Sequence, residues 1–184
     1  MTPHPYDVSG RHVAVVGGGR SGLAASRLVI ERGGRATLID AKPDIAERAE
    51  LEAIGVALHL GAMPDDVPPT TDLVVVSPGV PADVTPLRAA RARGVVVIGE
   101  LEFAASFVRG PVIAITGSKG KSTTTTLLGR MIAASGQPVL VGGNIGVPLS
   151  AQVHDSTPVT WHVVETSSFQ LETIVHYHPR VAAW

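Results

Sequence analysis

Apolar runs of four or five residues recur along the first hundred positions, and most of them are rich in valine and isoleucine. Such short β-branched runs are typical of strands that are buried on both faces. Segments of helical length separate most of them. The predicted strands cover residues 12–16, 36–39, 56–60, 73–76 and 95–98, and the predicted helices cover residues 23–32, 45–54, 86–93 and 99–108. We therefore expect an α/β fold with a mostly parallel sheet and right-handed crossovers. The Pro- and Asp-rich residues 63–71 are expected to form a loop.

A second pattern of the same kind begins after a compact Arg-Gly-Pro break at residues 109–111. The strands predicted after this break cover residues 113–115, 139–141 and 159–164, and another strand begins near residue 181. A helix is expected after residue 121. Four of its apolar residues are spaced for one buried face, namely Leu127, Leu128, Met131 and Ile132. Two α/β patterns, each with its own glycine-rich turn, predict two domains, residues 1–109 and 110–184.

Composition narrows the class of protein. A hydrophobic content of 45% with 17% charged residues indicates a globular chain with a substantial core. The net charge of −1 argues against a nucleic acid or an anionic membrane as partner. The chain has no cysteine, which excludes disulfides and cysteine-ligated metals. No apolar stretch approaches 18 residues and no signal peptide is recognisable, so we expect a cytoplasmic protein, and a monomer.

A glycine-rich segment follows the predicted strand at 113–115. Residues 116–123 read Thr-Gly-Ser-Lys-Gly-Lys-Ser-Thr and open a helix. Backbone amides of such a loop point at phosphate oxygens, Lys121 would reach the terminal phosphates, and Ser122 is placed to ligate Mg²⁺. The longer phosphate-loop motif has Gly where this chain has Ile115. We predict a phosphate-binding loop rather than a turn that only joins a strand to a helix.

The first glycine-rich turn of the chain follows the first predicted strand. Residues 17–22 read Gly-Gly-Gly-Arg-Ser-Gly, which fits G-x-G-x-x-G, and Asp40 ends the next strand at the spacing of a ribose-binding acid. This pattern favours a nucleotide site, but a dinucleotide dehydrogenase would have the same fingerprint. Asp40 alone is also compatible with a turn carboxylate. The rigid turn at residues 77–79, Ser-Pro-Gly, ends another strand, where open α/β sheets bind ligands.

Two polar residues further along the chain, Asn144 and Glu165, are also candidates for the functional site. Asn144 lies in the turn Gly-Gly-Asn-Ile-Gly after a predicted strand and could serve as a hydrogen-bonding group or simply as part of a bare turn. Glu165 ends the apolar strand that follows. A carboxylate at the tip of a strand, downstream of a phosphate loop, favours a role in holding Mg²⁺ over a helix-capping role.

Taken together, these segments resemble the Mur ligase family. The resemblance rests on the phosphate loop at 114–123, the Gly-Gly-Asn-Ile-Gly turn, and the run Glu-Thr-Ser-Ser-Phe-Gln-Leu-Glu at 165–172. This run, with Ser77-Pro78-Gly79 and the first glycine-rich turn, is most similar to the branch of the family that adds D-glutamate. The family loop usually has Asn where this chain has Lys119, which leaves the role of that position open.

The resemblance implies a fold and a set of site residues. It implies a Rossmann-like UDP-binding domain followed by the first part of a P-loop ATPase-type domain, with no C-terminal domain in this sequence. The residues implied to bind ATP are Gly117, Ser118, Lys119, Gly120, Lys121, Ser122 and Thr123. Those implied to bind the UDP substrate are Gly19, Arg20, Ser21, Asp40, Ala41, Ser77, Gly79, Asn144, Ser167 and Gln170. Ser122 and Glu165 are implied to hold Mg²⁺, and Lys121 and Glu165 to act in catalysis.

The implied activity is an ATP-dependent ligase of peptidoglycan precursor synthesis that joins D-glutamate to UDP-N-acetylmuramoyl-L-alanine through an acyl phosphate. Segments that complete the family's active site do not follow within these 184 residues, so we expect this piece to lack ligase activity. The alternatives are an NAD(P)-binding oxidoreductase domain, a non-enzymatic nucleotide sensor, or another Mur or folylpolyglutamate-type ligase.

Overall fold

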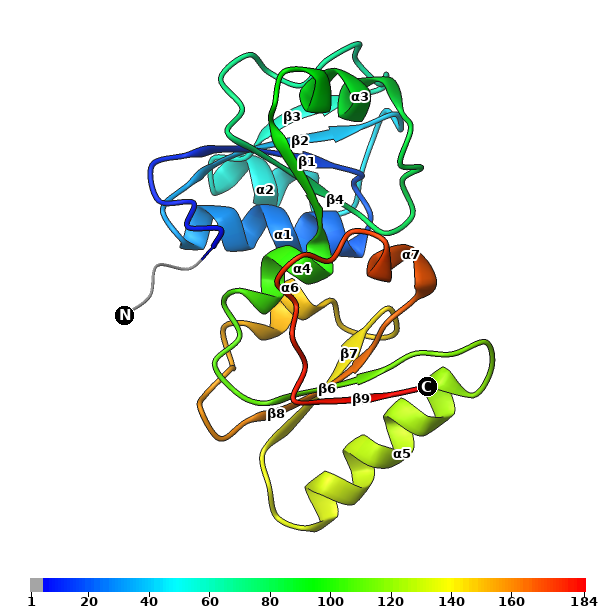
Figure 1. Cartoon of the computed structure of the whole chain (residues 1–184). Helices are drawn as coiled ribbons and strands as arrows, with labels where there is room; N and C mark the ends of the chain where they lie inside the picture. The colour runs from blue at the N-terminus through cyan, green and yellow to red at the C-terminus, as the bar shows by residue number, and fades with distance from the viewer. Residues whose placement is uncertain (1–4) are drawn as a thin grey trace.

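The computed structural model describes residues 5–184, which form two parallel β-sheets joined by helices (Figure 1). The first sheet has five strands in the order β3-β2-β1-β4-β5, and every neighbouring pair is parallel. Its strands are β1 (His12–Val16), β2 (Arg35–Asp40), β3 (Ala57–Leu60), β4 (Leu73–Val76) and β5 (Val96–Gly99). The predicted α/β fold with parallel sheets is therefore confirmed.

The helices of the first half are α1 (Arg20–Glu31), α2 (Arg48–Ala53), α3 (Thr85–Ala92) and α4 (Glu100–Ala105). The expected alternation of strand and helix breaks once. Between β3 and β4 the chain crosses the sheet as the predicted loop, without a helix. Val67 of this loop is 2% exposed and packs in one cluster with Leu87 of α3. The loop thus contributes to the covering of the sheet on that face.

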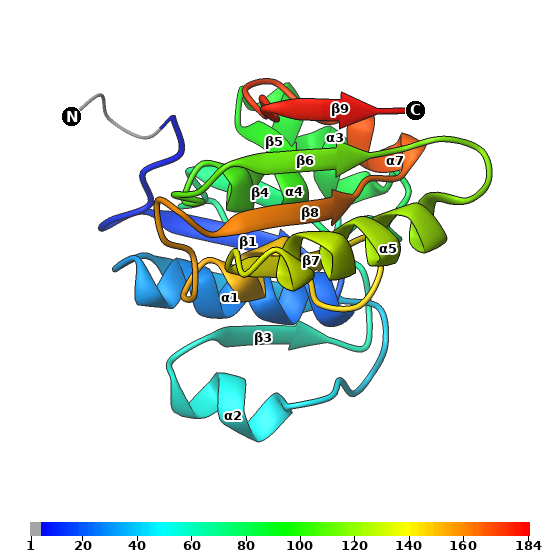
Figure 2. The ribbon, with the colours of Figure 1, turned by 90° about the horizontal axis from the view of Figure 1, so that it is seen from below.

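The second sheet has four parallel strands in the order β7-β8-β6-β9. Its strands are β6 (Val112–Ile115), β7 (Val139–Gly143), β8 (Trp161–Glu165) and β9 (Val181–Ala183). Its helices are α5 (Lys121–Ala134), α6 (Leu149–Gln152) and α7 (Ser168–Leu171). In Figure 2 the arrows of β3, β6, β8 and β9 point the same way, so the carboxyl ends of both sheets lie on one side of the molecule. Open parallel sheets bind ligands at that end.

Helix α5 packs closely on its sheet. A Cβ built on Gly129 would lie 2.2 Å from Val141 Cγ2 of β7, so only a glycine allows this approach. Thr125, one turn earlier, is fully buried.

The four apolar residues expected to form one buried face of α5 divide between two faces. Leu128 and Ile132 pack against the core of the second sheet. Leu127 and Met131 are 57% and 60% exposed. That part of the prediction is wrong, because the buried stripe follows Thr125, Leu128 and Ile132 at helical spacing and turns the other pair away.

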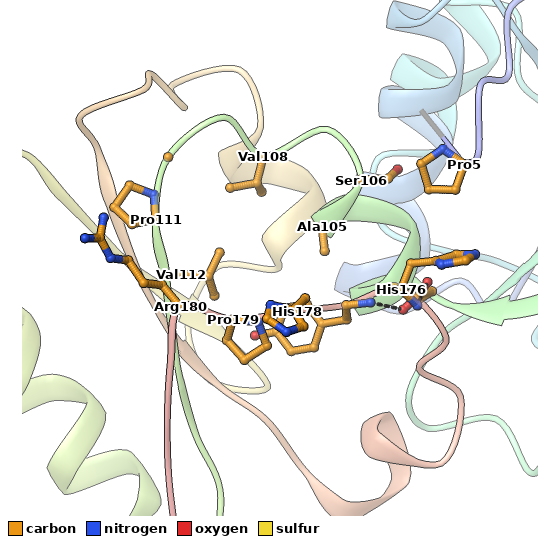
Figure 3. A pocket seen from close by; sticks show the side chains of 13 residues that line it. Pro5, Ala105, Ser106, Val108, Pro111, Val112, His176, His178, Pro179 and Arg180 are labelled. Atoms are coloured by element: carbon orange, nitrogen blue, oxygen red, sulfur yellow. Dashed lines mark hydrogen bonds between the residues drawn. The ribbon is translucent and has the colours of Figure 1, made fainter. Parts of the chain in front are cut away.

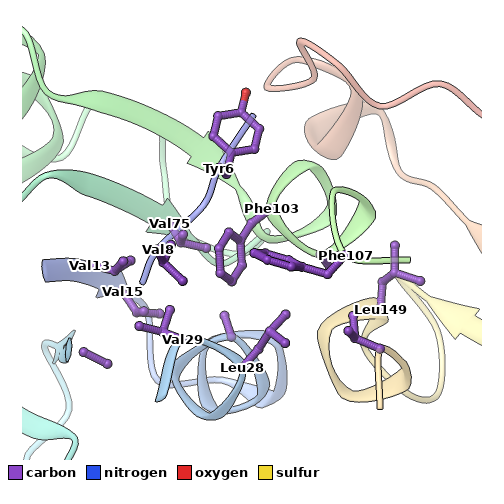
Figure 4. Packing of buried hydrophobic residues seen from close by; sticks show 14 of the residues in the cluster. Tyr6, Val8, Val13, Val15, Leu28, Val29, Val75, Phe103, Phe107 and Leu149 are labelled. Carbon is purple, nitrogen blue, oxygen red and sulfur yellow. The ribbon is translucent and has the colours of Figure 1, made fainter. Parts of the chain in front are cut away.

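One hydrophobic core joins the two sheets (Figure 4). Phe103 of α4 lies over α1, where Leu28 points toward it, and its ring centroid is 5.2 Å from that of Phe107. Leu149 of α6 is fully buried and belongs to the same cluster as Phe107 and Val164 of β8. Helices α1, α4 and α6 therefore pack together as the layer between the sheets.

A buried carboxylate also ties the two halves together. Glu102 of α4 is 1% exposed and accepts a 3.0 Å hydrogen bond from the Tyr6 hydroxyl. It also accepts the main-chain amides of Val175, His176 and Tyr177, at 3.0, 2.7 and 2.9 Å. A cavity of about 830 Å³ opens beside it, at the amino end of β6 (Figure 3). This cavity lies at the opposite end of β6 from the glycine-rich loop.

Candidate functional site

The glycine-rich loop after β6 connects that strand to the amino end of α5. Gly117 and Gly120 have φ angles of 128° and 76°, which L side chains rarely adopt. Lys121 Nζ donates a 2.7 Å hydrogen bond to the Gly117 carbonyl, so its side chain folds back over the loop. The unpaired amides at the start of α5 and this ammonium group together form a positive site suited to phosphate.

Ile115 stands where the longer phosphate-loop motif has glycine. It is 4% exposed and is the last residue of β6, paired with Glu165 of β8 and Ala183 of β9. Because this position still belongs to an inner strand, it needs an apolar side chain rather than the freedom of glycine. The turn begins only at Thr116, which makes the loop short.

Glu165 lies between the start of α5 and the turn after β7. It ends β8 and is 2% exposed. Ser122 Oγ donates a 2.6 Å hydrogen bond to Glu165 Oε2, and Asn144 Nδ2 donates one of 2.8 Å to Glu165 Oε1. The Asn144 amide also donates to the Glu165 carbonyl at 2.8 Å. One carboxylate thus joins the start of α5 to the turn after β7.

The close approach of that turn requires glycine at position 143. Gly143 has a φ of 98°, and a Cβ there would lie 2.5 Å from the Glu165 carbonyl oxygen. Within residues 5–184, no group of three or more His, Cys, Asp or Glu side chains is arranged to hold a metal ion. The structure brings the predicted pair Ser122 and Glu165 together at 2.6 Å, and their role toward Mg²⁺ stays a prediction.

The first glycine-rich turn is built in a comparable way at the carboxyl end of β1. A Cβ on Gly22 would lie 1.8 Å from the Gly17 carbonyl oxygen, so α1 begins in close contact with the turn. Ser77, at the end of β4, donates a 2.8 Å hydrogen bond from Oγ to the same carbonyl. Nothing lies within 4 Å of a Cβ built on Gly19, and this side of the turn is open.

Asp40 holds the turn and borders the open space. Its Oδ2 accepts the Gly18 amide in a short hydrogen bond, and its Oδ1 accepts the Lys42 amide at 2.8 Å. The structure thus gives Asp40 the turn-stabilising role that the sequence left open. The carboxylate also lines the cavity in front of the turn. Because each carboxylate oxygen has more than one acceptor site, both roles are compatible.

A cavity of about 390 Å³ lies between this turn and the turn after β7. The predicted site residues that line it come from both halves of the chain: Gly19, Arg20, Ser21, Asp40, Ser77, Gly79 and Asn144. Ala41 is exposed and does not line it. Lys42 lines the cavity and was missed by the sequence reasoning, although a cation two residues after the acid at a strand end was a visible signal.

Ser167 and Gln170 lie elsewhere, at the start of α7. They form a capping box, in which Ser167 Oγ accepts the Gln170 amide at 3.3 Å and Gln170 Oε1 accepts the Ser167 amide at 2.9 Å. Gln170 lines a separate, mainly apolar cavity of about 300 Å³ that shares Ser77 with the first one. Glu100 borders this second cavity, and burial raises the pKa of its carboxyl group.

Parallel sheets with glycine-rich turns at the carboxyl ends of their strands are an architecture in which many α/β proteins hold nucleotide phosphates. Two known protein-family domains match the chain. The Mur ligase MurD-like N-terminal domain matches residues 11–99, and the Mur ligase middle domain matches residues 115–184. The chain belongs to the Mur ligase family.

Curated relatives agree with this assignment. The UDP-N-acetylmuramoylalanine--D-glutamate ligase of Pelotomaculum thermopropionicum is 49% identical over 178 residues, which are 95% of this chain and 39% of that protein. The enzyme of the same name from Koribacter versatilis is 44% identical over 180 residues, 96% of this chain and 40% of that protein. The chain therefore spans about two-fifths of the length of these relatives.

Solved structures of the family share the fold. A murein peptide ligase from Psychrobacter arcticus superposes with a TM-score of 0.59 at 24% identity, covering 94% of this chain and 42% of that one. The UDP-N-acetylmuramate:L-alanyl-gamma-D-glutamyl-meso-diaminopimelate ligase from Neisseria meningitides gives 0.58 at 21% identity, covering 95% and 60%. Among residues 5–184 no helix has the length and apolarity needed to cross a membrane.

Proposed function

We propose that this chain supplies the UDP-substrate site and the ATP-phosphate site of a ligase that joins D-glutamate to UDP-N-acetylmuramoyl-L-alanine. The observation that carries the proposal is the cavity shared by the two halves: it borders the first glycine-rich turn, and Asn144 connects it to Glu165 and Ser122. The identity of 49% to a ligase of that name supports the choice of substrate. The reaction would take place in the cytoplasm, where ATP is available.

The two glycine-rich turns would divide the binding tasks. Residues 1–109 would hold the UDP part, with Gly19, Arg20, Ser21, Asp40 and Ala41 around the uridine and diphosphate and Ser77 and Gly79 beside them. Residues 110–184 would hold ATP through Gly117 to Thr123. Asn144, Ser167 and Gln170 would contact the muramoyl part. Ser167 and Gln170 lie outside the shared cavity, so that contact requires the substrate to extend toward α7.

In the proposed reaction the alanyl carboxylate attacks the γ-phosphate of ATP, which gives an acyl phosphate and ADP. The amine of D-glutamate then displaces phosphate and forms the amide. Lys121 would neutralise charge on the β- and γ-phosphates, and the start of α5 would fix their position. Ser122 and Glu165 would hold Mg²⁺, whose charge offsets the repulsion between the two anions. The chain's main task is to position two anions in line.

Calorimetric titration of the chain tests this proposal. UDP and Mg·ATP should each bind with saturation, and Lys121→Ala should weaken Mg·ATP binding without changing UDP binding. The exposed Lys42 lines the 390 Å³ cavity in front of the first glycine-rich turn. Lys42→Ala should therefore weaken UDP binding without changing Mg·ATP binding. Saturable binding of NADH with no response to UDP would overturn the proposal in favour of the oxidoreductase alternative. Phosphate release that requires both UDP-N-acetylmuramoyl-L-alanine and D-glutamate tests the activity of the whole protein.

A further inference from the structure

The turn between β7 and α6, residues 143–147, is held from both halves of the chain. On one side Arg20, the first residue of α1, donates a 2.9 Å hydrogen bond from Nη1 to the Gly146 carbonyl. On the other side Asn144 is bonded to Glu165 through both its side chain and its amide. The Gly143 amide closes the turn by donating to the Val147 carbonyl at 2.9 Å. This turn is therefore a short, internally bonded bridge.

Arg20 has donors to spare for a ligand. A guanidinium group carries five N–H donors in a rigid fork. Within residues 5–184, the bond to Gly146 is the one hydrogen bond that this guanidinium makes, and no carboxylate pairs with it. The side chain also lines the 390 Å³ cavity, beside the open face of the first glycine-rich turn. An anionic ligand there can take the remaining donors while Nη1 keeps the Gly146 carbonyl.

We infer that Arg20 is a positioning residue that couples a diphosphate-bearing ligand in the first turn to the Ser122–Glu165 pair. The inference rests on the proposed function and adds a route between its two sites. A ligand that fixes Arg20 also fixes Gly146, and with it the turn from which Asn144 orients the Glu165 carboxylate. That carboxylate is the same one that Ser122 contacts at 2.6 Å. A ligand bound at the first glycine-rich turn thus favours the orientation of Glu165 toward Ser122.

The test measures coupling rather than affinity alone. We expect saturating UDP to tighten Mg·ATP binding by about fivefold, near the lower end of usual coupling between sites, because the bond from Arg20 is exposed. Linkage requires Mg·ATP to tighten UDP binding by the same factor. In Arg20→Leu both ratios should fall to about one. The affinity of Arg20→Leu for Mg·ATP without UDP is measured separately, because the ratio of the affinities with and without UDP tests the coupling.

Control variants separate coupling from loss of structure. Arg27, on the same helix, pairs with Glu47 and Glu50 and does not line the cavity. Arg27→Leu should therefore keep the full coupling ratio. Arg20→Lys retains a charge and a donor and should restore part of it. In an Asn144→Ala background, Arg20→Leu should have no additional effect on the coupling ratio, because the side-chain hydrogen bond from the turn to Glu165 is already absent.

The outcomes distinguish this inference from the function on which it rests. If both ligands bind the unaltered chain but do not affect each other, or if Arg20→Leu retains the coupling, the inference is wrong and the proposed function stands. If the unaltered chain binds neither UDP nor Mg·ATP, the proposed function is wrong and the inference falls with it. Coupling that disappears in Arg20→Leu and persists in Arg27→Leu supports both.

Discussion

The hydroxyl of Ser122 and the carboxylate of Glu165 meet at 2.6 Å, although 43 positions separate them in the chain. Ser122 belongs to the first turn of α5, and Glu165 ends β8, which lies between β7 and β6 in the second sheet. The pairing of Ile115 with Glu165 brings the end of β6 level with the end of β8. A strand-end carboxylate and a helix-start hydroxyl thus lie side by side, and we propose this pair as the Mg²⁺ ligands.

This pair predicts a magnesium-specific effect of Glu165→Gln. The amide keeps the size of the side chain but loses its charge, so Mg²⁺-dependent ATP binding should weaken by at least about tenfold. Binding of ATP without Mg²⁺ should change little. Titrations with and without Mg²⁺ measure the difference, and Glu172→Gln, an exposed acid of the same segment, is the matched control. Equal losses with and without the metal would contradict the assignment of Glu165 to Mg²⁺.

Two glycines of the first turn should respond differently to alanine. A methyl group at Gly22 would lie 1.8 Å from a backbone oxygen, so Gly22→Ala should destabilise the fold by about 2 kcal/mol or more. Gly19 has open space around it and a φ of −77°. Gly19→Ala should leave the melting temperature within about 2 °C but weaken UDP binding, because its methyl group faces the cavity. Thermal melts and titrations of both variants test this contrast.

Glu102 is expected to matter for stability rather than for ligand binding. Glu102→Gln removes one acceptor oxygen and places an amide donor among the main-chain donors of residues 175–177, which should cost about 2–4 kcal/mol. Tyr6→Phe removes a single hydrogen bond to the same carboxylate and should cost about 1 kcal/mol. Urea unfolding gives both free energies. A smaller loss for Glu102→Gln than for Tyr6→Phe would contradict the role given to the main-chain bonds.

Glu100 predicts a pH dependence of stability. Its carboxyl is 1% exposed, and although the Ser150 amide bonds one oxygen at 2.8 Å, the other has no hydrogen-bond partner within residues 5–184. Burial raises its pKa above the ordinary 4.5. The folded chain therefore binds this proton more tightly than the unfolded chain, and the free energy of unfolding falls as the pH rises from 4.5 through the folded pKa.

Glu100→Gln removes this titration and keeps an oxygen for the Ser150 amide. The variant should melt higher than the unaltered chain at neutral pH, and the advantage should shrink as the pH falls to 4.5 and below. Differential scanning calorimetry across pH 4 to 8 measures it, with the exposed Glu31→Gln as control. A constant difference at every pH would show that Glu100 does not titrate as described.

The sequence was sufficient for the parallel α/β fold and for the family, because both depend on local signals. Val-rich strands and glycine-rich turns recur in the chain with little ambiguity. The apolar face of α5 was harder, since Leu127 and Leu128 are adjacent and either could begin the buried stripe. The close fit of Gly129 against β7 decides it, and that contact is not visible in periodicity.

Strand order and short helices were also beyond the sequence. The neighbourhood of Glu165, Ser122 and Asn144 depends on β8 lying between β7 and β6, which is a long-range property. Helices α6 and α7 have four residues each, too few to show a helical period. Gln170 lines the 300 Å³ cavity and not the 390 Å³ cavity, and the Ser-Ser-Phe-Gln run does not reveal this placement by itself. The roles proposed for these side chains stay predictions.

The hydrophobic core that contains both Phe107 and Leu149 bears on how this chain can be divided. Both residues belong to one core that includes side chains from both sheets. A cut near residue 109 would break no hydrogen bonds within either sheet, but it would leave part of the core of each half exposed to water. The two halves should then be poor modules: neither is expected to remain soluble alone, and the whole should melt in a single transition. Exchange of one sheet for another nucleotide-binding unit, in a laboratory or in evolution, would require this shared interior to be rebuilt first.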